Sequence, residues 1–159
     1  MSNNSGLLSN WPRRCVAGLF LLLMSCSQLP PTGAVAIPPV APGAARIWIY
    51  RNDTPQDSQE RPYLRLNGQP AGIAEPNGAL YRDLPPGHYM VSVDSYGAPF
   101  PNQFAEVDLI AGQTAFVKVL SRREKVGGPE ASRAVYFTQI VPADAARAAI
   151  AAIPFYGGS

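Results

Sequence analysis

The sequence is poor in the residues that most often carry catalysis and metal binding. Its 159 residues include one histidine and two cysteines, and charged residues make up only 15% of the chain. A Cys/His metal site or a histidine-based triad therefore has no complete set of residues. The net charge is +2, and beyond Arg13 and Arg14 the chain holds 11 basic and 11 acidic residues. Without the first 25 residues the chain is neutral and lacks the basic surface that nucleic acid requires, so we expect no nucleic-acid partner. The few cysteines and the single histidine lead us to expect no metal, and a core rich in aliphatic residues needs no cofactor.

Long apolar runs are also scarce, and the clearest one lies near the N-terminus. Residues 16–23 are apolar and follow Arg13 and Arg14. As a helix, eight residues span about 12 Å, far less than the ~30 Å hydrocarbon core of a bilayer. The pattern predicts a signal peptide over residues 1–25 and not a membrane span.

The end of this segment, Leu23-Met24-Ser25-Cys26, resembles the bacterial lipoprotein box. The resemblance implies cleavage before Cys26, a diacylglycerol thioether on its sulfur and an acyl chain such as palmitate on the new amine. Several acyl chains anchor a protein firmly. Ser27 is not the aspartate that retains lipoproteins in an inner membrane, so we expect an outer-membrane anchor facing the periplasm. The alternative is an ordinary signal peptide with an incidental cysteine.

The chain after residue 25 is predicted to have no disulfide and to begin with a proline-rich segment. Cys15 would be removed and Cys26 lipidated, so no disulfide is expected in the folded domain. Residues 26–44 hold five prolines and no charge. Such a segment favours polyproline II at about 3.1 Å per residue, which predicts a tether of roughly 50 Å.

Residues 45–141 alternate between apolar and polar side chains with a period of two, interrupted by turn signals such as Asn67-Gly68. This pattern predicts an all-β fold, an antiparallel β-sandwich of seven or eight short strands. The expected strands are 46–50, 63–66, 69–75, 79–83, 88–94, 104–110, 114–120 and 134–141.

Residues 142–159 are predicted to form a short C-terminal helix and tail. Pro142 suits a helix start, and Asp144 is favourable in the first turn. Ala146, Ile150 and Ile153 share one face, so we expect the helix to cover a sheet before it stops at Pro154.

The order Ile49-Tyr50-Arg51, Leu66-Asn67-Gly68, Leu84-Pro85-Pro86-Gly87-His88-Tyr89 and Ala111-Gly112-Gln113 with Phe116-Val117-Lys118-Val119 resembles the family called domain of unknown function 2846, or DUF2846. The resemblance covers residues 46–140 and implies a prealbumin-like β-sandwich in a bacterial lipoprotein or secreted protein. Ala115 departs from the aromatic residue expected before Phe116. The family has no established activity, so the resemblance implies no catalytic residue.

Three groups of polar residues are candidates for chemical sites. His88 lies beside a turn with no second ligand or nucleophile at a recognisable spacing, which favours a structural or exposed role. Glu106 and Asp108 project from one exposed strand face, whereas paired catalytic carboxylates need one acid in a desolvated pocket. Asp53, Asp57 and Glu60 lack the spacing of a calcium loop and are interpreted as solvated loop residues.

Two further parts of the sequence are candidates for binding surfaces. The stretch Arg122–Lys125, with Gly127-Gly128-Pro129, predicts a polar hairpin-like loop whose basic residues could contact anionic lipid. Arg46, Trp48 and Tyr50 lie opposite Ile47 and Ile49, and an aromatic and arginine-rich face is typical of binding surfaces. The competing interpretation is that the tail helix or a loop covers this face.

The sequence thus predicts a lipid-anchored envelope protein with a non-enzymatic binding or structural module. Its expected partners are membrane lipid through Cys26 and, beyond it, envelope proteins or cell-wall material. The alternatives are an enzyme with an unrecognised site and a glycan- or lipid-binding module. A deep pocket with a perturbed acid would favour an enzyme, and a flat aromatic patch would favour binding.

Overall fold

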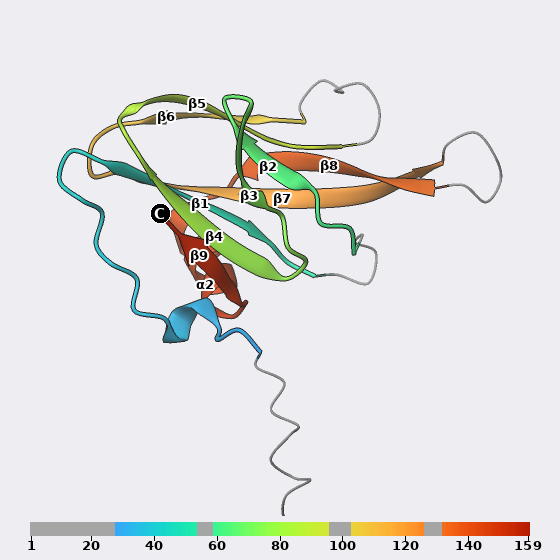
Figure 1. The fold of residues 1–159 in the computed structure, drawn as a ribbon, viewed down its shortest axis with the longest axis horizontal. Helices are drawn as coiled ribbons and strands as arrows, with labels where there is room; N and C mark the ends of the chain where they lie inside the picture. The colour runs from blue at the N-terminus through green and yellow to red at the C-terminus, as the bar shows by residue number, and fades with distance from the viewer. Residues whose placement is uncertain (1–27, 54–58, 96–102, 126–131) are drawn as a thin grey trace, which may run out of the picture.

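The computed structural model describes residues 28–53, 59–95, 103–125 and 132–159. They form the predicted all-β sandwich, with two sheets packed face to face (Figure 1). One sheet has the strand order β8-β7-β1-β4-β9 and the other β3-β2-β5-β6. The strands are β1 (Ala45–Arg51), β2 (Tyr63–Leu66), β3 (Gln69–Ile73), β4 (Gly78–Leu84), β5 (Gly87–Val93), β6 (Ala105–Leu109), β7 (Thr114–Lys125), β8 (Ser132–Ile140) and β9 (Phe155–Gly158).

The core between the sheets consists of the inward side chains of the alternating strands. Leu64, Val91 and Val107 come from the smaller sheet, and Ile47 and Val117 from the larger one. All of them are buried. The period-two pattern therefore assigned the inward faces correctly, because successive side chains of a strand point to opposite sides.

The Asn67-Gly68 hairpin is confirmed. The φ angles of these residues are 49° and 79°, which is the left-handed pair that a tight two-residue turn requires. The turn joins β2 to β3, and Leu66 pairs with Gln69 across it. The Asn67 side chain also accepts a hydrogen bond from Met90 N at 2.7 Å and so ties the turn to β5.

The strand count and direction differ from the prediction. Nine strands lie in the described residues, and two pairs are parallel, β1 with β7 and β4 with β9. Alternation reports which face a residue occupies and carries no information about strand direction. β7 also extends to Lys125, which pairs with Ser132, so the predicted polar excursion begins as two strands of a long hairpin.

The short C-terminal helix is confirmed as α2 (Ala143–Ala151), which ends before Pro154 as predicted. It packs on the outer face of the larger sheet, opposite the smaller sheet, and makes a third layer (Figure 1). Ala146, Ile150 and Ile153 are buried there, as expected for one apolar face. The chain then turns at Pro154 and adds β9 beside β4.

The proline-rich segment is not a free tether over its whole length. Thr32 N and Oγ1 both donate to Ile153 O, at 2.8 and 2.9 Å, and Phe155 N donates to Pro30 O at 3.1 Å. Residues Thr32–Ala34 form one 3-10 turn, labelled η2. Ile37 packs against the same apolar layer as α2. The prediction of an undocked linker up to residue 44 is therefore wrong for residues 30–38.

Candidate functional site

The face that carries Arg46, Trp48 and Tyr50 is covered. Only 4%, 8% and 3% of the surface of these three residues is exposed to solvent. Ala146, Ile150, Ile153 and Phe155 pack over them together with Ile37. Burial also raises the pKa of the Tyr50 hydroxyl. The hypothesis that the three residues form an exposed binding surface is wrong, and the competing interpretation of a covering helix is confirmed.

Trp48 is the centre of an aromatic cluster within this layer. Its ring lies 5.1 Å from the Tyr81 ring and 6.0 Å from the Phe155 ring, measured between centroids. Tyr81 and Phe155 stack at 5.9 Å. The cluster joins β1, β4 and β9, so β9 depends on the same side chains that were candidates for binding.

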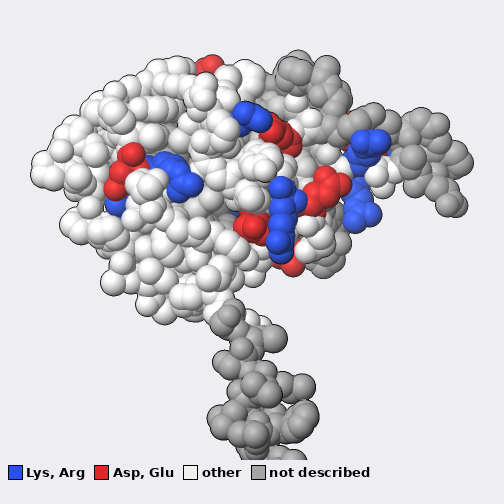
Figure 2. Space-filling view, viewed as in Figure 1, with Lys and Arg blue, Asp and Glu red and all other residues white. Residues whose placement is uncertain are grey.

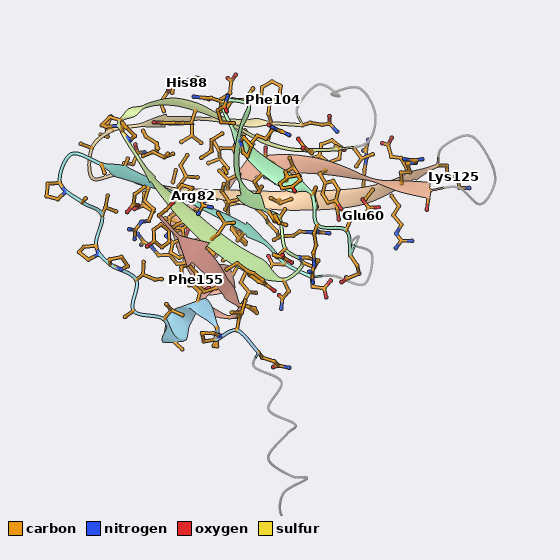
Figure 3. The ribbon with its side chains drawn as sticks, viewed as in Figure 1. Glu60, Arg82, His88, Phe104, Lys125 and Phe155 are labelled. Carbon is orange, nitrogen blue, oxygen red and sulfur yellow. The ribbon has the colours of Figure 1, made fainter. Side chains whose placement is uncertain are left out.

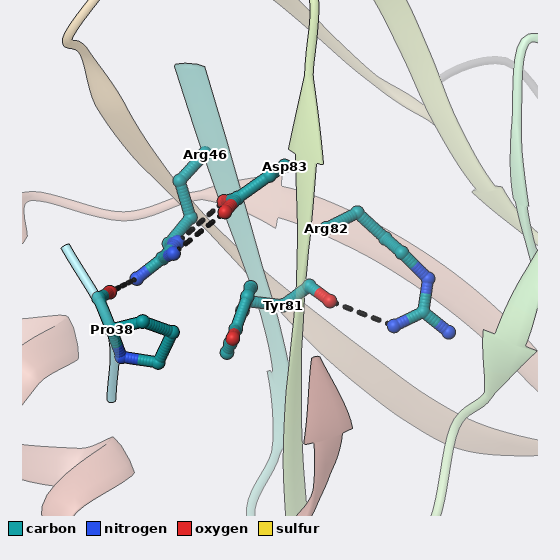
Figure 4. Close-up of polar contacts among 5 residues, drawn as sticks. All are labelled: Pro38, Arg46, Tyr81, Arg82 and Asp83. Carbon is teal, nitrogen blue, oxygen red and sulfur yellow. Dashed lines mark hydrogen bonds and ion pairs between the residues drawn. The ribbon is translucent and has the colours of Figure 1, made fainter. Parts of the chain in front are cut away.

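Arg46 is held by a bidentate ion pair (Figure 4). Its Nε and Nη2 donate to the two carboxylate oxygens of Asp83 at 2.6 and 2.7 Å, and Nη1 donates to Pro38 O at 2.8 Å. The hydrogen bond with Asp83 raises the pKa of the guanidinium. The guanidinium also lies 3.9 Å from the Tyr81 ring centroid. Arg46 therefore fastens β4 and the N-terminal segment to β1.

A groove opens beside this layer, where η2, α2, β1 and β7 meet. Its volume is about 260 Å³. Trp48, Phe116 and Ile150 supply apolar surface, and Thr32, Arg46 and Arg147 supply polar groups. Sequence reasoning missed the groove because it depends on the docking of residues 30–38. A signal was present in Ile37, a large aliphatic residue in the proline-rich segment that a solvated tether does not need.

His88 lies on the exposed face of the smaller sheet (Figure 3). It is paired there with Asp108: the distance between His88 Nδ1 and Asp108 Oδ1 is 2.8 Å, and both side chains are more than half exposed. The two residues are neighbours because β5 and β6 pair them directly. The predicted outward position of Glu106 and Asp108 is confirmed, since both are exposed.

The His88 pair should be visible in a pH titration. The hydrogen bond with Asp108 raises the pKa of His88 above 6.5. The stabilisation that this pair gives the folded state is complete below the pKa of a histidine in the unfolded chain, about 6.5. It is lost as the pH rises through the higher pKa of His88 in the folded chain. We expect the His88 ring signals in NMR to titrate above pH 6.5 and Asp108→Asn to lower that midpoint.

A matched variant identifies the cause. Glu106→Gln removes a more distant charge and should lower the His88 midpoint less than Asp108→Asn does. Equal midpoints in the wild type and Asp108→Asn would contradict the pair. His88 is the sole histidine of the chain, so the assignment of its signal is unambiguous.

The acidic loop is only partly described, and Asp57 lies outside the described residues. Asp53 accepts a hydrogen bond from Gln59 at 3.0 Å. Arg51 is buried and donates from Nη1 to Glu60 O at 2.9 Å and to Ala74 O at 3.2 Å. Within the described part of the chain, no group of three potential metal ligands comes together.

The charged end of the β7–β8 hairpin has mixed sign. Arg122 pairs with Glu124, and the Arg122 guanidinium lies 4.9 Å from the Phe137 ring centroid. Lys125 lies near the hairpin tip (Figure 3), and residues 127–129 are outside the described ranges. On the face seen in Figure 2, basic and acidic side chains lie close together. Lipid contact through this hairpin stays a prediction.

No helix among the described residues has the length and hydropathy to cross a membrane. Cys26 lies outside the described residues, so its lipidation also stays a prediction. Neither a protein-family model nor a curated protein matches the chain, and the resemblance to the DUF2846 family accordingly stays a prediction.

Proposed function

We propose that this chain is an acylated lipoprotein of a bacterial cell envelope, with a non-enzymatic binding or structural β-sandwich. The anchor would be Cys26, in an outer membrane and facing the periplasm. Partners would be membrane lipid and envelope proteins or cell-wall material. Two features support this: the resemblance of residues 23–26 to a lipoprotein box, and the short distance along the chain from Cys26 to the folded domain.

The observation that supports it most is the docking of residues 30–38. Pro30 lies only four residues after Cys26, and its carbonyl accepts a hydrogen bond from Phe155 N. Four residues span at most about 14 Å. An acylated Cys26 would therefore hold the third layer, with α2 and β9, close to the lipid headgroups and not at the end of a 50 Å tether.

An enzyme with an unrecognised site is the alternative. A general acid in a pocket would have a raised pKa. Among the described acids, Asp94 has its pKa lowered, because Arg65 donates to both of its oxygens at 2.5 and 2.8 Å. The His88–Asp108 pair lies on an open strand face. These features support a binding or structural module.

Labelling of the two cysteines tests the anchor. In bacteria grown with an alkyne fatty acid, we expect the wild-type chain and Cys15→Ser to incorporate label and Cys26→Ser to lose it. Mass spectrometry should place the mature N-terminus at Cys26 with diacylglyceryl and acyl groups. Label in the Cys26→Ser chain, or an unmodified N-terminus at another residue, would contradict the proposal.

A further inference from the structure

The groove between η2, α2 and β7 contains a cation that the fold does not neutralise. Arg147, on the exposed side of α2, lies over Phe116, with the guanidinium carbon 5.6 Å from the ring centroid. No carboxylate pairs with Arg147 among the described residues. Arg46, the other cation of the groove, is matched by the two oxygens of Asp83. The groove therefore presents one unmatched positive charge.

The rest of the groove suits the first atoms of an apolar chain. Trp48, Phe116 and Ile150 are nearly buried by the fold, and what remains open of them lines the groove. A volume of about 260 Å³ is slightly below that of typical ligand sites, which run from about 300 to 1,000 Å³. It fits a headgroup with a few carbons and is too small for a whole diacyl lipid.

The position of the groove indicates where such a ligand would come from. Thr32 lines the groove and lies six residues after Cys26. Six residues reach at most about 20 Å. If Cys26 is acylated, the groove lies within that distance of the bilayer surface. The inference rests on the proposed function in this respect.

We propose that the groove binds the phosphate headgroup of an anionic phospholipid. Arg147 donates to a phosphate oxygen, a contact that a planar guanidinium makes well. Trp48 and Phe116 contact the glycerol and the first acyl carbons. The anchor and the groove would then hold the domain in one orientation on the membrane.

The indole of Trp48 reports occupancy of the groove. The chain has two tryptophans, Trp11 and Trp48. In the full chain carrying Trp11→Phe, Trp48 is the only indole, whether or not the first 25 residues are removed. This chain, held in protein-free phosphatidylcholine vesicles if it is acylated and in buffer if it is not, is titrated with dihexanoyl-phosphatidylglycerol, which is soluble as a monomer. We expect a saturable change in Trp48 emission, and at least tenfold weaker binding of dihexanoyl-phosphatidylcholine.

Two arginine variants locate the charge that matters. Arg147→Gln should weaken the binding of dihexanoyl-phosphatidylglycerol about tenfold, since a charge-assisted hydrogen bond is lost. Arg123→Gln makes the same charge change on an exposed part of β7 and should leave binding unchanged. An absent signal, equal binding of the two lipids, or equal effects of the two variants would overturn the proposal.

Inorganic phosphate separates a lipid from a free anion. It lacks the apolar atoms that Trp48 and Phe116 contact, so it should compete at least tenfold more weakly than the short-chain lipid. Equal competition would overturn the assignment to phospholipid. Because the probe is soluble, this assay does not require acylation. A positive titration with failed Cys26 labelling would contradict the anchor alone, and the reverse would contradict the groove alone.

Discussion

Replacing Trp48 with alanine should lower the free energy of unfolding by about 3–5 kcal/mol, the usual loss for a large buried aromatic side chain. The indole fills the space between Tyr81 and Phe155 and is 8% exposed. Its removal leaves a cavity beneath α2 and β9, whose Ala146, Ile150 and Phe155 pack in the same apolar layer. Urea unfolding followed by circular dichroism measures the loss without depending on tryptophan fluorescence.

Tyr63→Ala is the control for this measurement. Tyr63 is an aromatic residue of β2 that is 56% exposed. Exposed substitutions of this kind change stability by roughly 0.5 kcal/mol or less. If Trp48→Ala were as mild as Tyr63→Ala, the Arg46, Trp48 and Tyr50 face would be open to solvent and the covering layer would be wrong.

The second large effect is expected for Asp83→Asn. The substitution leaves the charge of Arg46 buried beside a neutral amide. The amide has one acceptor oxygen, so it replaces only one of the two hydrogen bonds that the carboxylate accepts. Breaking a buried pair costs about 3–5 kcal/mol, and about 2–3 kcal/mol is expected here because the Asp83 side chain keeps some exposure to solvent. Its side chain is 24% exposed and that of Arg46 is 5% exposed. Thermal and urea unfolding of the variant check this value.

The chain offers a matched pair at another place. Arg65 and Asp94 form the same bidentate contact, but their side chains are 35% and 42% exposed. Asp94→Asn should therefore cost much less stability than Asp83→Asn, and its effect should shrink further in high salt. Equal losses in the two variants would show that burial does not set the strength of the Arg46 pair.

Much of the sandwich could be predicted because its strands have one buried face each. Inward residues such as Val91 and Val107 recur with a period of two, and turn residues such as Asn67 mark the ends. β9 was missed because Phe155–Gly158 is four residues long and half glycine, so it shows no alternation. Its position depends on β4 and on the Tyr81 ring, which lies so close to Gly158 that a Cβ there would meet it at 2.0 Å.

The candidate site could be predicted only in part. The outward direction of Trp48 followed from its neighbours Ile47 and Ile49, but the layer that covers it depends on long-range docking. Proline content suggested an extended segment with no partner. Proline lacks an amide hydrogen yet keeps its carbonyl acceptor. Pro30 and Pro38 use those carbonyls to bind Phe155 and Arg46, so an extended segment became part of the domain.

The docked N-terminal segment also determines how a pulling force would enter the domain. A load applied to the chain before Pro30 first reaches two contacts, the hydrogen bond between Pro30 and Phe155 of β9 and those between Thr32 and Ile153, two residues after α2. These bonds are few compared with the strand ladders behind them. If they open, residues 30–44 can extend to a length of about 50 Å at about 3.3 Å per residue. The segment is then short at rest and longer under tension, and it extends before the load reaches β1.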